Sequence, residues 1–205
     1  MRVIAGIYRS RILKSLKGLA LRPTSDRLRE TLFNVLGSGI QGSRFLDIFA
    51  GTGAVGIEAL SRGAQHVSFV ENHAPSAALI RKNLAALNVH TGVTVICADA
   101  VRAFETLEAK VKASPPDASD AAYDYIFIDP PYAAAADYSR VLQKLAASKL
   151  LADGGIVTVE HRKTFDLPES FNTLKHVRLL RQGDAALSFY RRDEALPAIA
   201  NVDNP

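Results

Sequence analysis

Hydrophobic positions along the chain follow two alternating rhythms, one typical of strands and one typical of helices. Short apolar runs predict buried strands at 45–49, 66–70, 93–97, 125–128 and 156–159. After each of the first four runs, apolar residues recur at helical spacing, which predicts helices ending at about 62 and spanning 75–87, 101–111 and 138–151. Strands and helices that alternate in this way predict an α/β fold with a mostly parallel sheet and helices on both faces.

The two ends of the chain depart from this alternation. Residues 2–14 predict a small basic β-hairpin around Gly6 and Ser10, followed by a helix that Ser25 or Asp26 caps and nearby glycines end. Terminal strands at 178–180 and 186–190 bring the predicted sheet to seven strands. We therefore expect an N-terminal extension over 1–36, a main domain over 37–192 and a flexible tail over 193–205, with a turn-rich loop at 114–121.

Composition narrows the class of protein. The chain has 205 residues, of which 48% are hydrophobic and 22% charged, so we expect one folded domain and not a disordered or disulfide-bonded scaffold. Its single cysteine, Cys97, has no partner for an internal disulfide and lies in an apolar run, so we expect it in the core. No apolar run reaches membrane-spanning length and the first residues lack a signal-peptide pattern, so the expected location is the cytoplasm.

Charge is unevenly distributed along the sequence. Residues 1–34 carry eight basic and two acidic side chains, a net charge of +6, and residues 161–192 carry a net charge of +4. Residues 35–160 between them carry a net charge of −3. Basic flanks around an acidic middle favour an anionic partner that approaches one side of the molecule.

A glycine-rich loop follows the first predicted strand. The motif Gly51-x-Gly53-x-x-Gly56 opens a helix, and Glu71 follows about 20 residues later at the end of the next strand, as in nucleotide-binding folds. Asp99 follows the third strand, and the carboxyl ends of parallel strands meet at one edge of a sheet, where ligands bind. The sequence therefore predicts a nucleotide site at this edge.

These residues fit two ligands, a nicotinamide dinucleotide and S-adenosylmethionine, and do not distinguish between them. Glu71 suits the ribose of either ligand, Asp99 suits an adenine amine, and Asp47 suits the ammonium group of S-adenosylmethionine. A dinucleotide fingerprint usually lies near the chain start, whereas here some 44 residues precede it.

The motif Asp129-Pro130-Pro131-Tyr132 directly follows the fourth strand. It favours S-adenosylmethionine over a nicotinamide dinucleotide as the bound nucleotide. Two prolines fix the backbone and remove two N–H donors, which leaves carbonyl oxygens beside a carboxylate. Such a set accepts the hydrogens of an exocyclic amine and orients its lone pair toward an electrophile, while Tyr132 stacks on the base. The motif predicts methyl transfer to a base amine.

The other reactive side chains give weaker indications of function. The five histidines are scattered without metal-ligand spacing, so we predict no metal site. His161 follows Glu160 at a strand end, where a surface or capping role is expected over a place in the pocket.

The combined motifs resemble the RsmD family of amino-methyltransferases. The resemblance rests on RPTSDRLRETLFN at 22–34 and LDIFAGTGAVGIEALSRG at 46–63, together with Glu71, Asp99 and the 129–132 motif, and it extends from Arg2 to about Tyr190. A Pro/Ala/Ser-rich stretch at 113–122 departs from the family pattern as a loop insertion. The family makes N2-methylguanine in bacterial 16S rRNA, which implies a Rossmann-like methyltransferase domain over 37–192 and an RNA-facing extension over 1–36.

The resemblance also implies roles for individual residues. Asp129 and the carbonyl of Pro130 would hold the guanine amine, with Tyr132 on the ring. S-adenosylmethionine would be bound by residues of the strand ends and loops: Asp47, Gly51, Thr52, Gly53, Glu71, Asn72, Asp99 and Ala100. RNA would be contacted by residues of the basic extension, of which Arg22, Thr24, Arg27 and Arg29 would border the target entrance and Arg2, Arg9, Arg11 and Lys14 would meet phosphate.

Two rival functions remain at this stage. The same motif would serve an adenine amine in DNA, although the chain has no evident domain for reading a DNA sequence. A non-catalytic ribosome-assembly factor would retain the fold but would be expected to lose the acid or the Pro-Pro pair, and both are present. The basic extension has few aromatic residues, so we expect phosphate and shape contacts with rRNA inside a partly assembled small subunit, by a protein acting as a monomer without an obligate protein partner.

Overall fold

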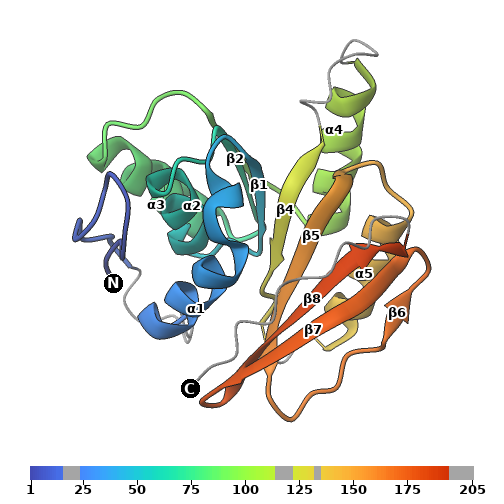
Figure 1. Cartoon of the computed structure of the whole chain (residues 1–205). Helices are drawn as coiled ribbons and strands as arrows, with labels where there is room; N and C mark the ends of the chain where they lie inside the picture. The colour runs from blue at the N-terminus through green and yellow to red at the C-terminus, as the bar shows by residue number, and fades with distance from the viewer. Residues whose placement is uncertain (16–23, 114–121, 132–134, 194–205) are drawn as a thin grey trace.

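A computed structural model describes residues 1–15, 24–113, 122–131 and 135–193 (Figure 1). Within this part of the chain, eight strands form one sheet in the order β3-β2-β1-β4-β5-β8-β7-β6. The strands are β1 (Arg44–Ile48), β2 (His66–Glu71), β3 (Val93–Cys97), β4 (Tyr123–Ile128), β5 (Leu151–Arg162), β6 (Ser170–Phe171), β7 (Leu174–Gln182) and β8 (Ala185–Arg192). The helices are α1 (Asp26–Leu36), the 3-10 helix η1 (Gly37–Ile40), α2 (Ala54–Ser61), α3 (Ala74–Ala86), α4 (Ala100–Ala113) and α5 (Ala135–Ala146). The turn-rich loop predicted at 114–121 and the tail predicted after 193 lie outside the described residues.

The sheet is parallel from β3 to β5 and antiparallel beyond. β1 lies between β2 and β4, and β8 pairs antiparallel with both β5 and β7. All of the strands β1 to β4 therefore end at the same edge, where the polar residues that follow them meet. This confirms the predicted Rossmann-like α/β fold.

Helices cover both faces of the sheet because alternate strand residues point to opposite sides. Phe45 of β1 packs in a cluster with α1, α2 and α3, while Leu46, the next residue, packs in a second cluster with α4 and α5. Phe127 and Ile128 of β4 divide in the same way. Since residues of α1 lie in the first cluster, the helix of the N-terminal extension is part of the main core.

Three predictions about elements are wrong in detail. Within the described residues the sheet has eight strands and not seven, because β6 is only two residues long and pairs at the edge, too short for an alternating pattern. The last predicted helix ends at Ala146, and Leu151 instead begins β5, whose pairing with β4 shifts register around Gly154, a residue with φ +74°. Cys97 is exposed, because β3 is the other edge of the sheet.

The predicted basic N-terminal hairpin is short. Arg2 and Ile12 form one antiparallel bridge, and backbone hydrogen bonds join residues 1–3 to residues 10–13 around it. Gly6 and Ser10 both have positive φ angles, where the chain turns between the two arms. The segment 1–15 is also anchored by α2: Glu58 accepts hydrogen bonds from the backbone N–H of Ile4 and Ala5, at 2.8 and 3.0 Å.

Among the helices of the described residues, none has the length and apolar character needed to cross a membrane.

Candidate active site

The glycine loop after β1 takes a conformation that only glycine adopts easily. Gly51 and Gly53 have φ angles of +54° and +77°, and Gly53 is the N-cap of α2. A Cβ on Gly53 would lie 3.2 Å from side-chain atoms of Ile80, so the loop also packs closely against α3. Gly56 in α2 lies directly over β2, where a Cβ would come within 2.3 Å of the Phe69 ring. The loop therefore lies close against α3 at the end of β1, where the N–H of Gly51 is bound by Glu71.

Glu71 connects the end of β2 to this loop. Its carboxylate accepts hydrogen bonds from the N–H of Gly51 at 2.7 Å and from the N–H of His73 at 2.8 Å. Two such bonds leave acceptor positions on both oxygens, and these suit the two hydroxyls of a ribose. Asn72 lies beside it and is exposed.

Asp47 is buried under the same loop. The residue is 1% exposed, and its carboxylate accepts a hydrogen bond from the N–H of Gly56 at 2.9 Å. Burial, with a smaller contribution from the charge of Glu71, raises the pKa of Asp47 to about 7, although the Gly56 bond opposes the shift. Thr52 is half-buried in the loop, and its carbonyl accepts a hydrogen bond from Asn83.

Asp99 lies after β3, immediately before the buried Ala100 that begins α4. Its carboxylate accepts a hydrogen bond from the N–H of Val101 and forms two with the guanidinium of Arg140, at 2.8 and 3.3 Å. These bonds to Arg140 hold the pKa of Asp99 below its usual value. Sequence reasoning missed Arg140; its only signal was the spacing from Asp137, three residues earlier on α5, with which it also pairs.

Asp129 completes the edge at the end of β4. Its N–H donates to the carbonyl of Ile48 at the end of β1, which places the motif beside the glycine loop. The carboxylate is half-buried and lies near Glu160 and Asp47, and burial together with these two negative charges raises its pKa well above the usual value. Pro130 is buried and Pro131 exposed, while Tyr132 lies outside the described residues.

Two residues predicted to contact RNA, Thr24 and Arg29, are buried, and Thr24 lies beside Asp129. The Thr24 hydroxyl donates to Glu160 at 2.7 Å and lies 3.4 Å from Asp129. Arg29 is 0% exposed, and its guanidinium donates to backbone carbonyls at Thr24 and Arg2 and to the Asp26 carboxylate. The prediction that Arg29 contacts RNA is therefore wrong for this conformation, because α1 turns this side chain toward the core.

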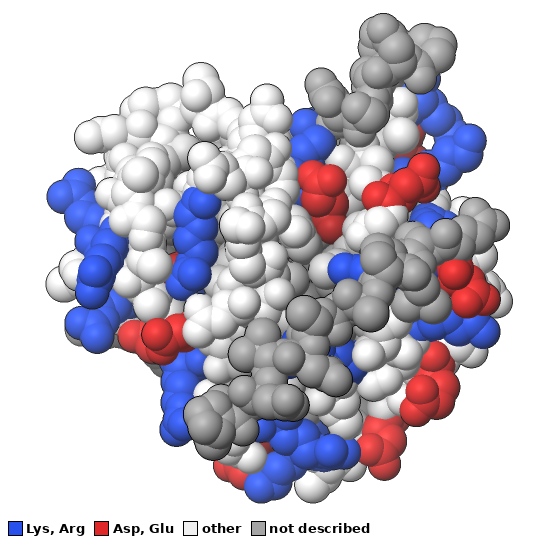
Figure 2. Space-filling view, viewed as in Figure 1, with Lys and Arg blue, Asp and Glu red and all other residues white. Residues whose placement is uncertain are grey.

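The other residues predicted to contact RNA are on the surface. Arg2, Arg9, Arg11, Lys14 and Arg27 are exposed, and Arg22 lies outside the described residues. Figure 2 shows Lys and Arg side chains gathered along the left edge of the molecule, where Figure 1 draws the N-terminal segment. This edge is the candidate nucleic-acid interface.

His161 is neither at the surface nor in the site. Its ring is hydrogen-bonded to Ser188 of β8 and to the carbonyl of Arg162, and it is buried between strands. The expected surface or capping role is wrong, because β8 covers this part of β5.

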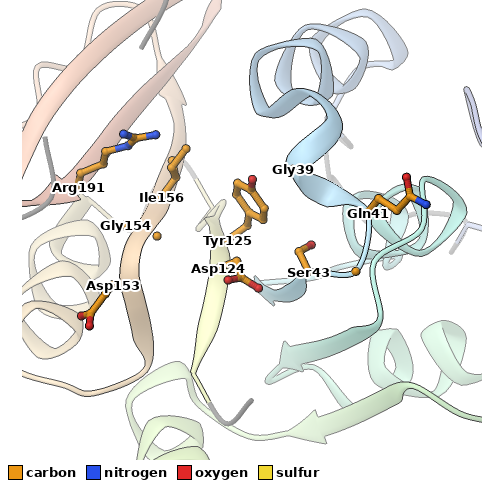
Figure 3. A pocket seen from close by; sticks show the side chains of 11 residues that line it. Gly39, Gln41, Ser43, Asp124, Tyr125, Asp153, Gly154, Ile156 and Arg191 are labelled. Atoms are coloured by element: carbon orange, nitrogen blue, oxygen red, sulfur yellow. The ribbon is translucent and has the colours of Figure 1, made fainter. Parts of the chain in front are cut away.

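A cavity of about 300 Å³ lies at the opposite edge of the sheet. Tyr125, Asp153 and Arg191 line it together with Gly39 of η1, as Figure 3 shows. It opens beside the beginning of β1 and β4, so it is separate from the residues that follow these strands.

Comparisons with known proteins agree with this arrangement. A family model described as "Conserved hypothetical protein 95" matches residues 1–191. The Ribosomal RNA small subunit methyltransferase D of Haemophilus influenzae is 34% identical over 177 residues, which cover 85% of this chain and 86% of that protein.

Solved structures show that this similarity to known proteins includes the fold. The Escherichia coli protein yhhF gives a TM-score of 0.76 at 30% identity, covering 94% of this chain and 97% of that one. The protein SMU.776, solved complexed with SAH, gives a TM-score of 0.61 at 17% identity over 80% of this chain and 48% of that one, which shows a shared fold. The residues at the sheet edge, the family model and the Haemophilus relative lead to one conclusion: the chain belongs to the RsmD family.

Proposed function

We propose that this protein transfers a methyl group from S-adenosylmethionine to the exocyclic N2 of a guanine in small-subunit (16S) rRNA. The observation that carries the proposal is the position of Asp129 and Pro130, which follow β4 beside the glycine loop of β1. The name of the Haemophilus relative supports rRNA as the class of substrate.

The donor set at the sheet edge fits S-adenosylmethionine. Glu71 would hold the ribose, the backbone at Gly51 and Gly53 would line the methionine portion, and Asp99 would meet the adenine amine while its other contacts go to Arg140. When bound, the cofactor supplies an electrophilic methyl group on a sulfonium. Asp47 would face the ammonium group from below the loop, where a cation would favour its ionised form.

Asp129 and Pro130 would then orient the acceptor amine. A base amine is a poor nucleophile because its lone pair is delocalised into the ring. The Asp129 carboxylate and the Pro130 carbonyl would accept its two hydrogens, which points the lone pair at the methyl carbon for a direct in-line transfer. The carboxylate also stabilises the positive charge that develops on nitrogen. Tyr132 would stack on the guanine, which must be unpaired or flipped out to reach the site.

Transfer of labelled methyl groups to undermethylated small ribosomal subunits tests this proposal, with digestion of the RNA to nucleosides. We expect label in N2-methylguanosine, and we expect Asp129→Ala to lower turnover by on the order of 100-fold or more while the affinity for S-adenosylmethionine stays nearly constant. Asp153→Asn, a change of an exposed acid at the opposite edge, is the matched control. Label in N6-methyladenine of added DNA would instead identify an adenine methyltransferase.

The same assay tests the state of the substrate. The exposed basic side chains suit phosphate contacts more than base readout, so we propose a partly assembled subunit as the substrate. Equal rates on naked 16S rRNA and on the particle would contradict this.

A further inference from the structure

Three polar side chains from distant parts of the sequence meet behind the Asp129 carboxylate. Thr24 precedes α1, Asp129 follows β4 and Glu160 lies near the end of β5. The Thr24 Oγ1 is 2.7 Å from Glu160 Oε2 and 3.4 Å from Asp129 Oδ2. Thr24 and Glu160 are 6% and 4% exposed, so the Thr24 hydroxyl connects Asp129 to an acid that water hardly reaches.

Buried contacts hold the bridging hydroxyl in place. Arg29 donates to the carbonyl of Thr24 at 3.0 Å, and the same guanidinium is bound by Arg2 and Asp26. A threonine hydroxyl has a single hydrogen, so the shorter contact identifies Glu160 as its acceptor. The Thr24 oxygen is then able to accept a hydrogen from Asp129 whenever Asp129 is protonated.

The charged groups around this arrangement favour uptake of a proton by Asp129. Asp47 faces Asp129 from β1, Glu160 faces it from β5, and Arg29 of α1 contacts the Thr24 carbonyl. Acids held close together in a desolvated site repel one another, and the pKa of Asp129 is raised accordingly. A proton that reaches Asp129 while both acids are ionised relieves this repulsion.

We propose that Glu160, through the hydroxyl of Thr24, takes up the proton that the methylated amine gives to Asp129. Glu160 is thus a positioning residue, since it acts through Thr24 and Asp129 without touching the base. The inference rests on the proposed methyl transfer to an exocyclic amine and adds to it the route of the departing proton.

Atoms and charge balance in each step of this route. The amine nitrogen forms a bond to the methyl carbon, and the carbon–sulfur bond breaks with its electron pair going to sulfur. The nitrogen, now positively charged, passes one proton to the Asp129 carboxylate. Asp129 passes this proton to Thr24 Oγ1 while the Thr24 hydroxyl proton moves to Glu160, which restores the Asp129 carboxylate. Glu160 loses the proton by the reverse path once the base has left and water reaches Asp129.

Glu160→Gln tests the route with little change of shape. The Gln side-chain carbonyl still accepts the Thr24 hydrogen bond but does not take up a proton. We expect kcat at its high-pH plateau to fall about tenfold or more, with an unchanged dissociation constant for S-adenosylmethionine. Removal of the Glu160 charge also lowers the pKa of Asp129, so the acidic limb of the kcat/KM profile moves to lower pH.

Thr24→Val provides a second variant with a different pH signature. It removes the bridge, so the plateau of kcat falls as in Glu160→Gln. The charge of Glu160 stays in place, so the acidic limb does not move to lower pH as it does in Glu160→Gln. Thr24→Ser keeps the hydroxyl and is expected to recover most of the rate. Asp153→Asn, on the same strand as Glu160 but at its other end, controls for a change of charge on β5.

The outcomes separate this inference from the function on which it rests. If the wild type makes N2-methylguanosine and Glu160→Gln shifts neither the plateau nor the acidic limb, the inference alone is overturned. An equal loss of rate in Thr24→Val and Thr24→Ser would mean a structural role and would overturn it too. A wild-type protein that transfers no methyl to N2 would overturn both.

Discussion

Asp47 illustrates how burial, as the largest of several effects, raises the pKa of a residue in this site. In the unfolded chain its pKa is near 3.8, and in the folded protein it is about 7. Between these values the folded state binds more protons than the unfolded state, so the free energy of unfolding falls as pH rises. The difference of about three units corresponds to on the order of 4 kcal/mol lost between about pH 4 and pH 7.

Asp47→Asn is therefore expected to flatten the pH dependence of stability. Asn keeps an oxygen to accept the Gly56 N–H but does not ionise. Urea unfolding at intervals from pH 4 to pH 8 measures the effect, with the exposed Asp153→Asn as control. Parallel curves for the wild type and Asp47→Asn would contradict the raised pKa.

Arg27 and Arg29 form a matched pair on α1, one exposed and one buried. Arg29→Met leaves the carbonyls of Thr24 and Arg2 without the guanidinium that binds them, and we expect the free energy of unfolding to fall by about 3 kcal/mol. Arg27→Ala is expected to change it by less than about 0.5 kcal/mol and to weaken RNA binding instead. Denaturant unfolding and RNA titration of both variants check this, and equal stability losses would show that the assignment is wrong.

At the scale of elements, α2 contributes to both proposed binding sites, the one for S-adenosylmethionine and the one for rRNA. Its N-terminus begins at the glycine loop, and Glu58 and Ser61 on its buried side bind the backbone of the N-terminal segment. Glu58 is 0% exposed and also pairs with Arg62 one turn later. The basic segment is thus held by contacts with α2 as well as by the short hairpin pairing between its own two arms.

Glu58→Ala is expected to release this segment while the glycine loop stays in place. The N–H groups of Ile4 and Ala5 lose their acceptors, so their hydrogen exchange accelerates and rRNA affinity falls more than the affinity for S-adenosylmethionine. The free energy of unfolding falls by about 3 kcal/mol. Glu105→Ala, an exposed acid on α4, is the control. Unchanged exchange at both amides would show that α2 does not hold the segment.

At the scale of the whole molecule, the exposed basic side chains of the N-terminal segment and the acidic strand ends define different regions. An interface of this kind binds RNA through phosphates, so the affinity depends steeply on salt. We expect the triple change of Arg9, Arg11 and Lys14 to alanine to reduce the slope of log affinity against log salt by about one for each phosphate that the variant no longer binds. Filter binding to 16S rRNA at several salt concentrations measures the slope.

The control for this experiment is Lys112→Ala, in the last turn of α4 on the opposite side of Figure 1. It removes a positive charge without touching the candidate interface. A similar reduction of the slope for Lys112→Ala would mean that binding depends on net charge and not on this surface.

The pattern of the sequence predicted the elements whose signal is local. Ser25 caps α1 as expected, with its hydroxyl accepting the N–H of Leu28, because capping depends only on neighbours in the chain. The parallel strands also lie where apolar runs predicted them. β6 had no such signal, since it results from pairing with β7 at the edge of the sheet.

For the same reason, the sequence did not predict which polar side chains are buried. Arg29 and Thr24 look like surface residues of a basic segment, and Cys97 looks like part of a core. The packing of α1 into the core, and the position of β3 at the sheet edge, reverse these expectations.

The sequence by itself determined the α/β order of elements, the glycine loop and the acids that end successive strands, because hydrophobic period and turn residues act over a few positions. The tertiary structure decided which of these groups share an environment. Thr24 is 105 residues from Asp129 and 136 residues from Glu160 in sequence, and these hydrogen bonds exist only once α1, β4 and β5 have packed together. The raised pKa of Asp129 depends on distance and desolvation, and both are properties of the folded molecule.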